Sequence, residues 1–287
     1  MEQPTAPTST PDPGPVPAPT GRAGRDLGAA VGVGVTIASV VLLTLFLYRP
    51  AFGLLVVAAV GAACYEIGTA LRAGSVRVAL WPLIVGGAGM GAAAWFYGLP
   101  GLAIGALLTF LVAVVRRMTG GTEGFVVSAA ASSLIILYVP FLAGFAVMMA
   151  SRDAGAAWVL AWAVAVVGND TGGYAAGVLF GRHPIAPTIS PKKSWEGFVG
   201  SLTVASIGSV LVYVLMLDGR WWQGVLFGLA MAMLATLGDF VESMIKRDLG
   251  VKDMSNLLPG HGGVMDRMDS LLFTAPPAWI LLTLFVG

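Results

Sequence analysis

Long apolar stretches dominate this chain and restrict its fold more than any other feature of the sequence. Only 11% of its 287 residues are charged, 57% are hydrophobic, and the mean hydropathy is +0.85. Soluble domains carry roughly 25% charged residues, and one core of this size could not bury so much apolar material. The sequence therefore predicts an all-α, polytopic integral membrane protein, because helices satisfy their own backbone groups within a bilayer.

About nine windows of the sequence are apolar and long enough to cross a bilayer. A hydrocarbon core about 30 Å thick needs roughly 20 residues of helix, because each residue advances the axis by about 1.5 Å. The predicted spans are 28–48, 51–71, 79–97, 100–115, 125–149, 156–180, 197–217, 222–241 and 268–286.

The first 27 residues differ from the rest of the chain. They contain seven prolines among threonine, serine and alanine, and they lack the apolar core of a signal peptide. This composition predicts a disordered tail. We therefore expect two parts, namely a Pro-rich tail at residues 1–27 and a transmembrane catalytic domain at residues 28–287.

Lysine and arginine are distributed unequally between the two sides that nine spans define. Thirteen lie on the side of the amino-terminal tail: Arg22, Arg25, Arg72, Arg77, Arg116, Arg117, Arg182, Lys192, Lys193, Lys246, Arg247, Lys252 and Arg267. The opposite side carries Arg49, Arg152 and Arg220. By the positive-inside rule, we expect a multi-pass protein of the cell inner (plasma) membrane, with its amino terminus and active site facing the cytoplasm.

Two segments on the predicted cytoplasmic side, residues 168–200 and 238–270, are long and polar, and we expect the active site there. In the second, Asp239, Glu242, Ser243 and Lys246 have the spacing of one helix face. A carboxylate at the rim of a membrane span costs a few kcal/mol unless a metal, a partner charge or water compensates it. This stripe therefore indicates a site rather than a lipid-facing surface.

Four carboxylates in these segments are candidate metal ligands: Asp170, Asp239, Asp266 and Asp269. Hard oxygen ligands without a cysteine or histidine cluster suit Mg²⁺ better than zinc or copper, and the lone Cys64 supplies no such cluster. A second metal or a monovalent cation could accompany it. The alternative is a set of interhelical ion pairs, for example between Asp239 or Asp170 and the neighbouring Lys246 or Arg247.

Basic residues beside these acids suit phosphate groups. The candidates are Lys192, Lys193, Lys246, Arg247, Lys252 and Arg267, and His261 lies in a glycine-bracketed PGHGG segment that could present N–H donors to phosphate. Their alternative role is attraction to lipid headgroups. The net charge of +1 gives no basic field, so we expect no nucleic-acid partner.

The segment from Ser243 to Asp269, SMIKRDLGVKDMSNLLPGHGGVMDRMD, resembles the signature of the CDP-diacylglycerol synthases, also called phosphatidate cytidylyltransferases. The upstream block is similar too, with matching positions at Asp170, Lys192, Lys193, Ser194, Trp195, Glu196 and Gly197. The two blocks cover about a fifth of the chain. The resemblance implies transfer of CMP from CTP to phosphatidic acid, which gives CDP-diacylglycerol and pyrophosphate in phospholipid biosynthesis. It also implies a divalent metal and a homodimer among membrane lipids.

The resemblance and the residue types together suggest roles for individual side chains. We expect catalytic roles for Asp239, Asp266, Lys246 and Lys193, and metal binding by Asp239, Asp266, Asp269 and Asp170. The expected substrate-binding residues are Lys192, Ser194, Ser243, Arg247, Lys252, His261 and Arg267.

Three other functions are compatible with a polytopic chain. A polyprenol or dolichol kinase would also use CTP at a membrane surface. A secondary transporter would place its ionisable residues near the bilayer midplane, often in paired broken helices, whereas here they gather at one side and no internal repeat is visible. A structural scaffold would have no use for several acids at the edge of the hydrocarbon.

Overall fold

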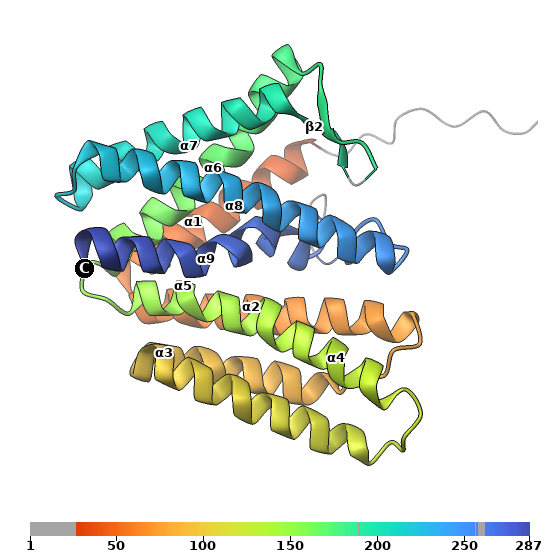
Figure 1. Ribbon diagram of the computed structural model, residues 1–287. Helices are drawn as coiled ribbons and strands as arrows, with labels where there is room; N and C mark the ends of the chain where they lie inside the picture. The colour runs from red at the N-terminus through yellow and green to blue at the C-terminus, as the bar shows by residue number, and fades with distance from the viewer. Residues whose placement is uncertain (1–26, 189, 256, 258–261) are drawn as a thin grey trace, which may run out of the picture.

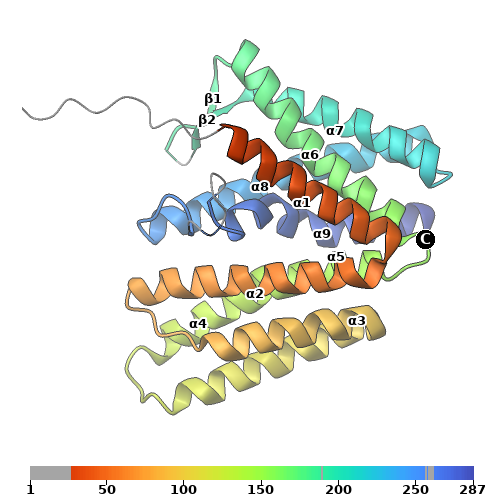
Figure 2. The ribbon, with the colours of Figure 1, turned by 180° about the vertical axis from the view of Figure 1, so that it is seen from behind.

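The computed structural model describes residues 27–188, 190–255, 257 and 262–287, so nearly all of the predicted tail lies outside the described residues. The elements are α1 (Leu27–Leu47), α2 (Arg49–Ala73), α3 (Leu80–Met118), α4 (Phe125–Ile136), the π-helical turn η1 (Leu137–Phe141), α5 (Leu142–Ala150), α6 (Gly155–Phe180), β1 (Pro184–Ala186), β2 (Ser190–Ser194), α7 (Trp195–Met216), α8 (Trp221–Asp248) and α9 (Met265–Val286). The helices lie side by side in one bundle, and the antiparallel β1–β2 hairpin projects from one end of it (Figures 1 and 2).

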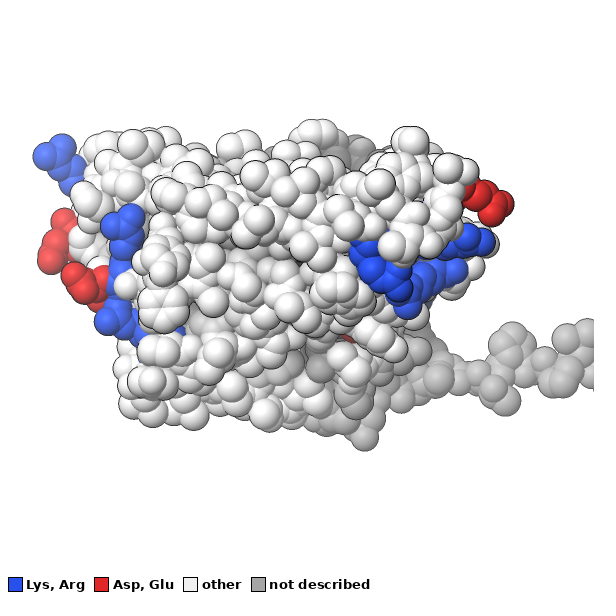
Figure 3. Space-filling view, turned by 90° about the horizontal axis from the view of Figure 1, so that it is seen from below, with Lys and Arg blue, Asp and Glu red and all other residues white. Residues whose placement is uncertain are grey.

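Among the described residues, six helical segments are long and apolar enough to cross a membrane: α2, α3, the continuous segment Phe125–Ala150, α7, α8 and α9. On the face drawn in Figure 3, charged side chains gather at the two ends and the surface between them is almost entirely uncharged. These observations support the predicted all-α membrane protein. The count of nine spans stays a prediction.

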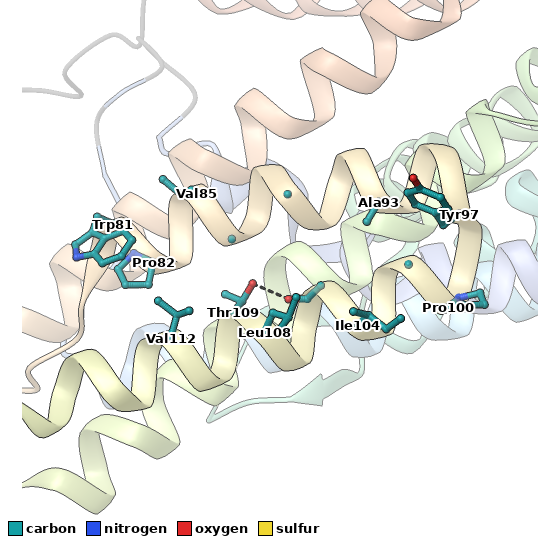
Figure 4. Close-up of a pocket in the computed structure, with 14 residues that line it drawn as sticks. Trp81, Pro82, Val85, Ala93, Tyr97, Pro100, Ile104, Leu108, Thr109 and Val112 are labelled. Atoms are coloured by element: carbon teal, nitrogen blue, oxygen red, sulfur yellow. Dashed lines mark hydrogen bonds between the residues drawn. The ribbon is translucent and has the colours of Figure 1, made fainter.

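Helix α3 is a hairpin of two arms rather than one straight rod. Its 39 residues bend at Gly98, where φ is +61°, and Pro100 follows at the start of the second arm. A cavity of about 640 Å³ lies between the arms, and all of its lining residues belong to α3 (Figure 4). Most of the lining side chains are apolar, and the Thr109 hydroxyl donates to the Gly105 carbonyl at 2.7 Å, so the cavity offers little for chemistry.

The segment that comprises α4, η1 and α5 lies at the centre of the bundle. It is 72% buried over its most apolar window, the highest fraction among the six candidate spans. Pro140 lies within the wider turn of η1, which accommodates a residue that cannot donate an amide hydrogen bond. Helix α5 contacts α2 and α3 on one side and α6 and α9 on the other, so it joins the two halves of the molecule.

Helices α6, α7 and α8 approach one another closely through glycines. A Cβ built on Gly228 of α8 would lie 2.4 Å from Cα of Ser206 in α7. A Cβ on Gly172 of α6 would lie 2.4 Å from the carbonyl oxygen of Gly200. Small residues at these contacts let the backbones meet, which is how helices associate in the absence of a hydrophobic driving force.

We expect Gly228→Ala to lower the thermal unfolding temperature in detergent, because the added methyl meets backbone atoms that cannot rotate away. Overpacking of this kind costs about 1–3 kcal/mol. Gly89→Ala is the matched control, since a Cβ there meets no atom within 4 Å. Equal unfolding temperatures for the two variants would contradict the close contact between α7 and α8.

Candidate active site

Each of the two polar segments begins and ends in a helix. The first segment contains the end of α6 and the start of α7, which flank the β1–β2 hairpin. This short hairpin is a departure from the expected all-α fold. It pairs only Pro184 with Ser194 and Ala186 with Ser190, and no alternation of apolar and polar residues marks such short strands.

Glu196, in the first turn of α7, anchors the hairpin. One of its oxygens accepts hydrogen bonds from the backbone N–H groups of Arg182 at 3.1 Å and His183 at 3.3 Å. Its other oxygen lies 2.6 Å from Nδ1 of His183. The Ser194 hydroxyl caps α7 by accepting from the Gly197 amide at 3.2 Å. The predicted substrate-binding Ser194 thus caps a helix in this structure.

Lys193 of the hairpin forms an ion pair with Asp239 of α8, so the two polar segments meet. The Lys193 ammonium also lies 4.8 Å from the ring centre of Phe240. Both partners of the ion pair remain partly accessible, with 29% and 20% of their side chains exposed. Lys193 and Asp239 were both predicted site residues, and the structure brings them together across 46 residues of sequence.

A cavity of about 350 Å³ opens beside this ion pair. It lies between α6, the hairpin, α7 and α8. Its polar lining consists of Asn169, Asp170, Tyr174, Ser190, Lys192, Lys193, Ser194, Ser201, Thr236 and Asp239. The Asn169 amide donates to Asp170 at 2.9 Å and thereby fixes the orientation of that carboxylate.

The predicted carboxylates divide into two groups. In the first, Asp170 of α6, Asp239 of α8 and Asp269 of α9 are close enough to interact electrostatically. Three cations neighbour this group: Lys193 pairs with Asp239, Arg267 interacts with Asp170, and Lys246 interacts with Asp269. Three separate helices therefore bring acids to one end of the bundle, beside the cavity.

The second group is built around Lys246, which pairs with Glu242 on the same helix and with Asp266 of α9 at 3.0 Å. Glu242 is 1% exposed and Asp266 is 8% exposed. Asp266 also accepts hydrogen bonds from the backbone N–H groups of Met254 at 3.0 Å and Gly263 at 2.8 Å. In this arrangement the oxygens of Asp266 hold the segment between α8 and α9.

Helix α8 ends in a way that directs the chain toward this group. Gly250 has φ of +68°, its amide donates to the Arg247 carbonyl at 3.1 Å, and the Val251 amide donates to the Lys246 carbonyl at 2.9 Å. This is a Schellman motif, for which glycine is favoured because it adopts positive φ without strain.

Glu66 of α2 belongs to the same end of the bundle, although sequence reasoning did not place it in the site. Its oxygens accept hydrogen bonds from the Ser255 hydroxyl at 2.6 Å and from the amides of Val264 at 3.0 Å and Met265 at 2.8 Å. Its side chain is buried, with 3% exposure. A lone glutamate within a predicted apolar span was the available signal.

The other predicted substrate-binding residues lie around these groups. Ser243 is half-buried on α8, and Lys192, Arg247, Lys252 and Arg267 are exposed. His261 lies outside the described residues.

The donor set fits a magnesium ion that takes few ligands from the protein. Among the described residues, no group of three His, Cys, Asp or Glu side chains converges as a preformed metal cage. Mg²⁺ needs no such cage, since one or two carboxylates, several waters and substrate phosphates complete its shell. Asp239 is the best placed, because it belongs to the first acidic group and also lines the cavity.

The sequence pattern of the cytidylyltransferase family matches residues 29–285, which is most of the chain. The chain belongs to this family. It is 39% identical to a phosphatidate cytidylyltransferase of Mycobacterium bovis, over 92% of this chain and 91% of that protein. A Mycobacterium leprae protein with the same name is 37% identical over 92% of this chain and 90% of its own length. A Bacillus subtilis protein of that name is 34% identical over 62% of this chain and 65% of its own length.

We expect Glu196→Ala to accelerate trypsin cleavage after Lys192 and Lys193 in detergent, because the residues that lead into β1 lose the carboxylate that binds them to α7. The matched control is Glu123→Ala, whose side chain is 89% exposed and contacts Arg77 only at 3.9 Å. Such surface pairs contribute about 0–1 kcal/mol. Unchanged cleavage in Glu196→Ala would show that Glu196 does not hold the hairpin.

Proposed function

We propose that this chain transfers CMP from CTP to phosphatidic acid and releases pyrophosphate, so that it supplies CDP-diacylglycerol for phospholipid biosynthesis. The match to the cytidylyltransferase family over most of the chain carries this proposal. The site supports it, because acids and cations from separate helices gather at one end of an apolar bundle, beside a cavity. A lipid phosphate and a water-soluble nucleotide can meet at such a place.

In the proposed reaction, an oxygen of the phosphatidate phosphate attacks the α-phosphorus of CTP in line. The new P–O bond forms as the bond to the β-phosphate oxygen breaks, and pyrophosphate leaves with that electron pair. No protein nucleophile is required, so the residues act by positioning the two phosphates and offsetting their charge.

We assign the phosphate contacts to Lys192 and Lys193 of the hairpin, which line the cavity with Asp239 and Asp170. Because Lys193 pairs with Asp239 here, we propose that it moves toward the CTP phosphates when they enter. Mg²⁺ held by Asp239, with Asp269 and Asp170 as its neighbours, would polarise the phosphate oxygens. Asp266 and Lys246 would keep the start of α9 in place beside them.

We also propose that the site faces the cytoplasm from the plasma membrane. Among the described residues, eleven lysines and arginines lie at the end of the bundle that carries the site, and three lie at the other end. This distribution supports the orientation by the positive-inside rule. A homodimer is a further proposal that rests on the family resemblance, and mass photometry in detergent would test it.

The reaction itself is tested with CTP that carries a radioactive label on either the α- or the γ-phosphate. We expect the α-label to enter the lipid when phosphatidic acid is the acceptor, EDTA to abolish the transfer, and added Mg²⁺ to restore it. We also expect Asp239→Asn to abolish transfer without changing elution from a gel-filtration column. Incorporation of the γ-label into a polyprenol would instead identify a kinase.

A second test concerns the cations of the hairpin. We expect Lys192→Ala to raise the KM for CTP by about 10-fold, because a charge-assisted contact contributes about 1.5–3 kcal/mol. Arg77→Ala is the control, since its exposed side chain lies at the same end of the bundle but outside the cavity. Equal KM values for the two variants would favour a general role of surface charge.

A further inference from the structure

We infer that Glu66 is a positioning residue of this enzyme: from α2, it holds the start of α9 and the preceding segment in the geometry that the active site needs. The inference rests on the proposed function only for its effect on CTP. The contacts themselves join parts of the chain that are 189 to 199 residues apart.

Glu66 acts as an N-cap supplied by a distant helix. Val264 precedes α9 and Met265 is its first residue, and neither amide has an acceptor within the helix. The two oxygens of Glu66 accept one of these amides each. Within the helix, Val264 supplies no side-chain cap. A carboxylate at this position also interacts favourably with the positive end of the helix dipole.

The contact is so close that a side chain at position 263 would force Glu66 to shift. A Cβ built on Gly263 would lie 2.7 Å from one oxygen of Glu66 and 3.0 Å from the other. The Ser255 hydroxyl contacts the same carboxylate at 2.6 Å. Glu66 is therefore contacted by Ser255 as well as by the residues at the start of α9.

The same segment continues directly into the active site. Gly263 donates its amide to Asp266, and Asp266 pairs with Lys246 of α8, which lies two turns beyond Asp239. Asp269, which interacts with Asp239, follows one turn later on α9. If the start of α9 shifts, Asp266 and Asp269 must shift with it, so a buried residue of α2 controls carboxylates that it does not touch.

The test compares Glu66→Ala with Tyr65→Phe, a neighbouring position whose side chain is 56% exposed. We expect Glu66→Ala to raise the KM for CTP and to lower kcat, each by about 10-fold, as for other groups that orient a site without touching substrate. Tyr65→Phe should match the wild type. A change confined to kcat, with KM unaltered, would indicate only a loss of folded enzyme and would overturn the inference.

Hydrogen exchange gives a readout that does not depend on activity. The amides of Val264 and Met265 should exchange about 10-fold faster in Glu66→Ala, because each loses a charge-assisted hydrogen bond. Unchanged exchange would overturn the inference even if activity fell. If wild-type protein failed to transfer CMP, the proposed function would fail, while the exchange measurement would still test the contact.

Two further variants keep the test informative if Glu66→Ala does not fold. Glu66→Gln keeps the side-chain volume but has one acceptor oxygen, so we expect an intermediate rise in KM. Gly263→Ala should impair the enzyme by crowding Glu66, and this effect should disappear in the Glu66→Ala background because the clashing carboxylate is gone. If the effects of the two substitutions were additive, the contact between Gly263 and Glu66 would not be the cause of the impairment, and the inference would be overturned.

Discussion

Carboxylates are buried at one end of an apolar bundle, and the cations and backbone amides that neutralise or bind them determine how the rest of the site is arranged. Glu242 and Asp266 share the Lys246 ammonium, and Asp266 and Glu66 accept backbone amides from the segment before α9. A buried charge that loses its partner costs about 3–5 kcal/mol, so each carboxylate fixes the groups around it. Charge-assisted hydrogen bonds thus hold the described parts of the segment between α8 and α9, in addition to the packing of Met254 in the apolar core.

Neighbouring carboxylates at this end of the bundle differ in the groups that they bind. Asp266 and Glu66 have oxygens that accept several N–H groups each, so they suit a supporting role. Asp239 instead pairs with the partly exposed side chain of Lys193 and lines the cavity, which is why the proposed mechanism assigns the metal to it. The two roles differ in whether the carboxylate accepts backbone N–H groups or pairs with a lysine, and residue type alone does not predict this.

Much of this arrangement could be predicted from the sequence, since apolar length and charge spacing act locally. The helices, the polar stripe of α8 and the shared end of Asp239 and Asp266 follow from such patterns. The β1–β2 hairpin did not, because its strands of three and five residues are too short to show a two-residue period. Glu66 was missed because its partners lie almost 200 residues away, and the supporting contacts of Asp266 come from backbone amides, which have no sequence signature.

The central position of the segment Phe125–Ala150 has a consequence for how the protein is made. This segment is apolar enough to enter a bilayer as soon as it leaves the ribosome, yet part of its eventual neighbourhood, α6 and α9, is synthesised afterwards. Until the last helix inserts, lipid must occupy the surface that α9 later covers. Assembly of the bundle is therefore completed from the carboxyl terminus, and a nascent chain that stops before α9 would leave its central helix open to the bilayer.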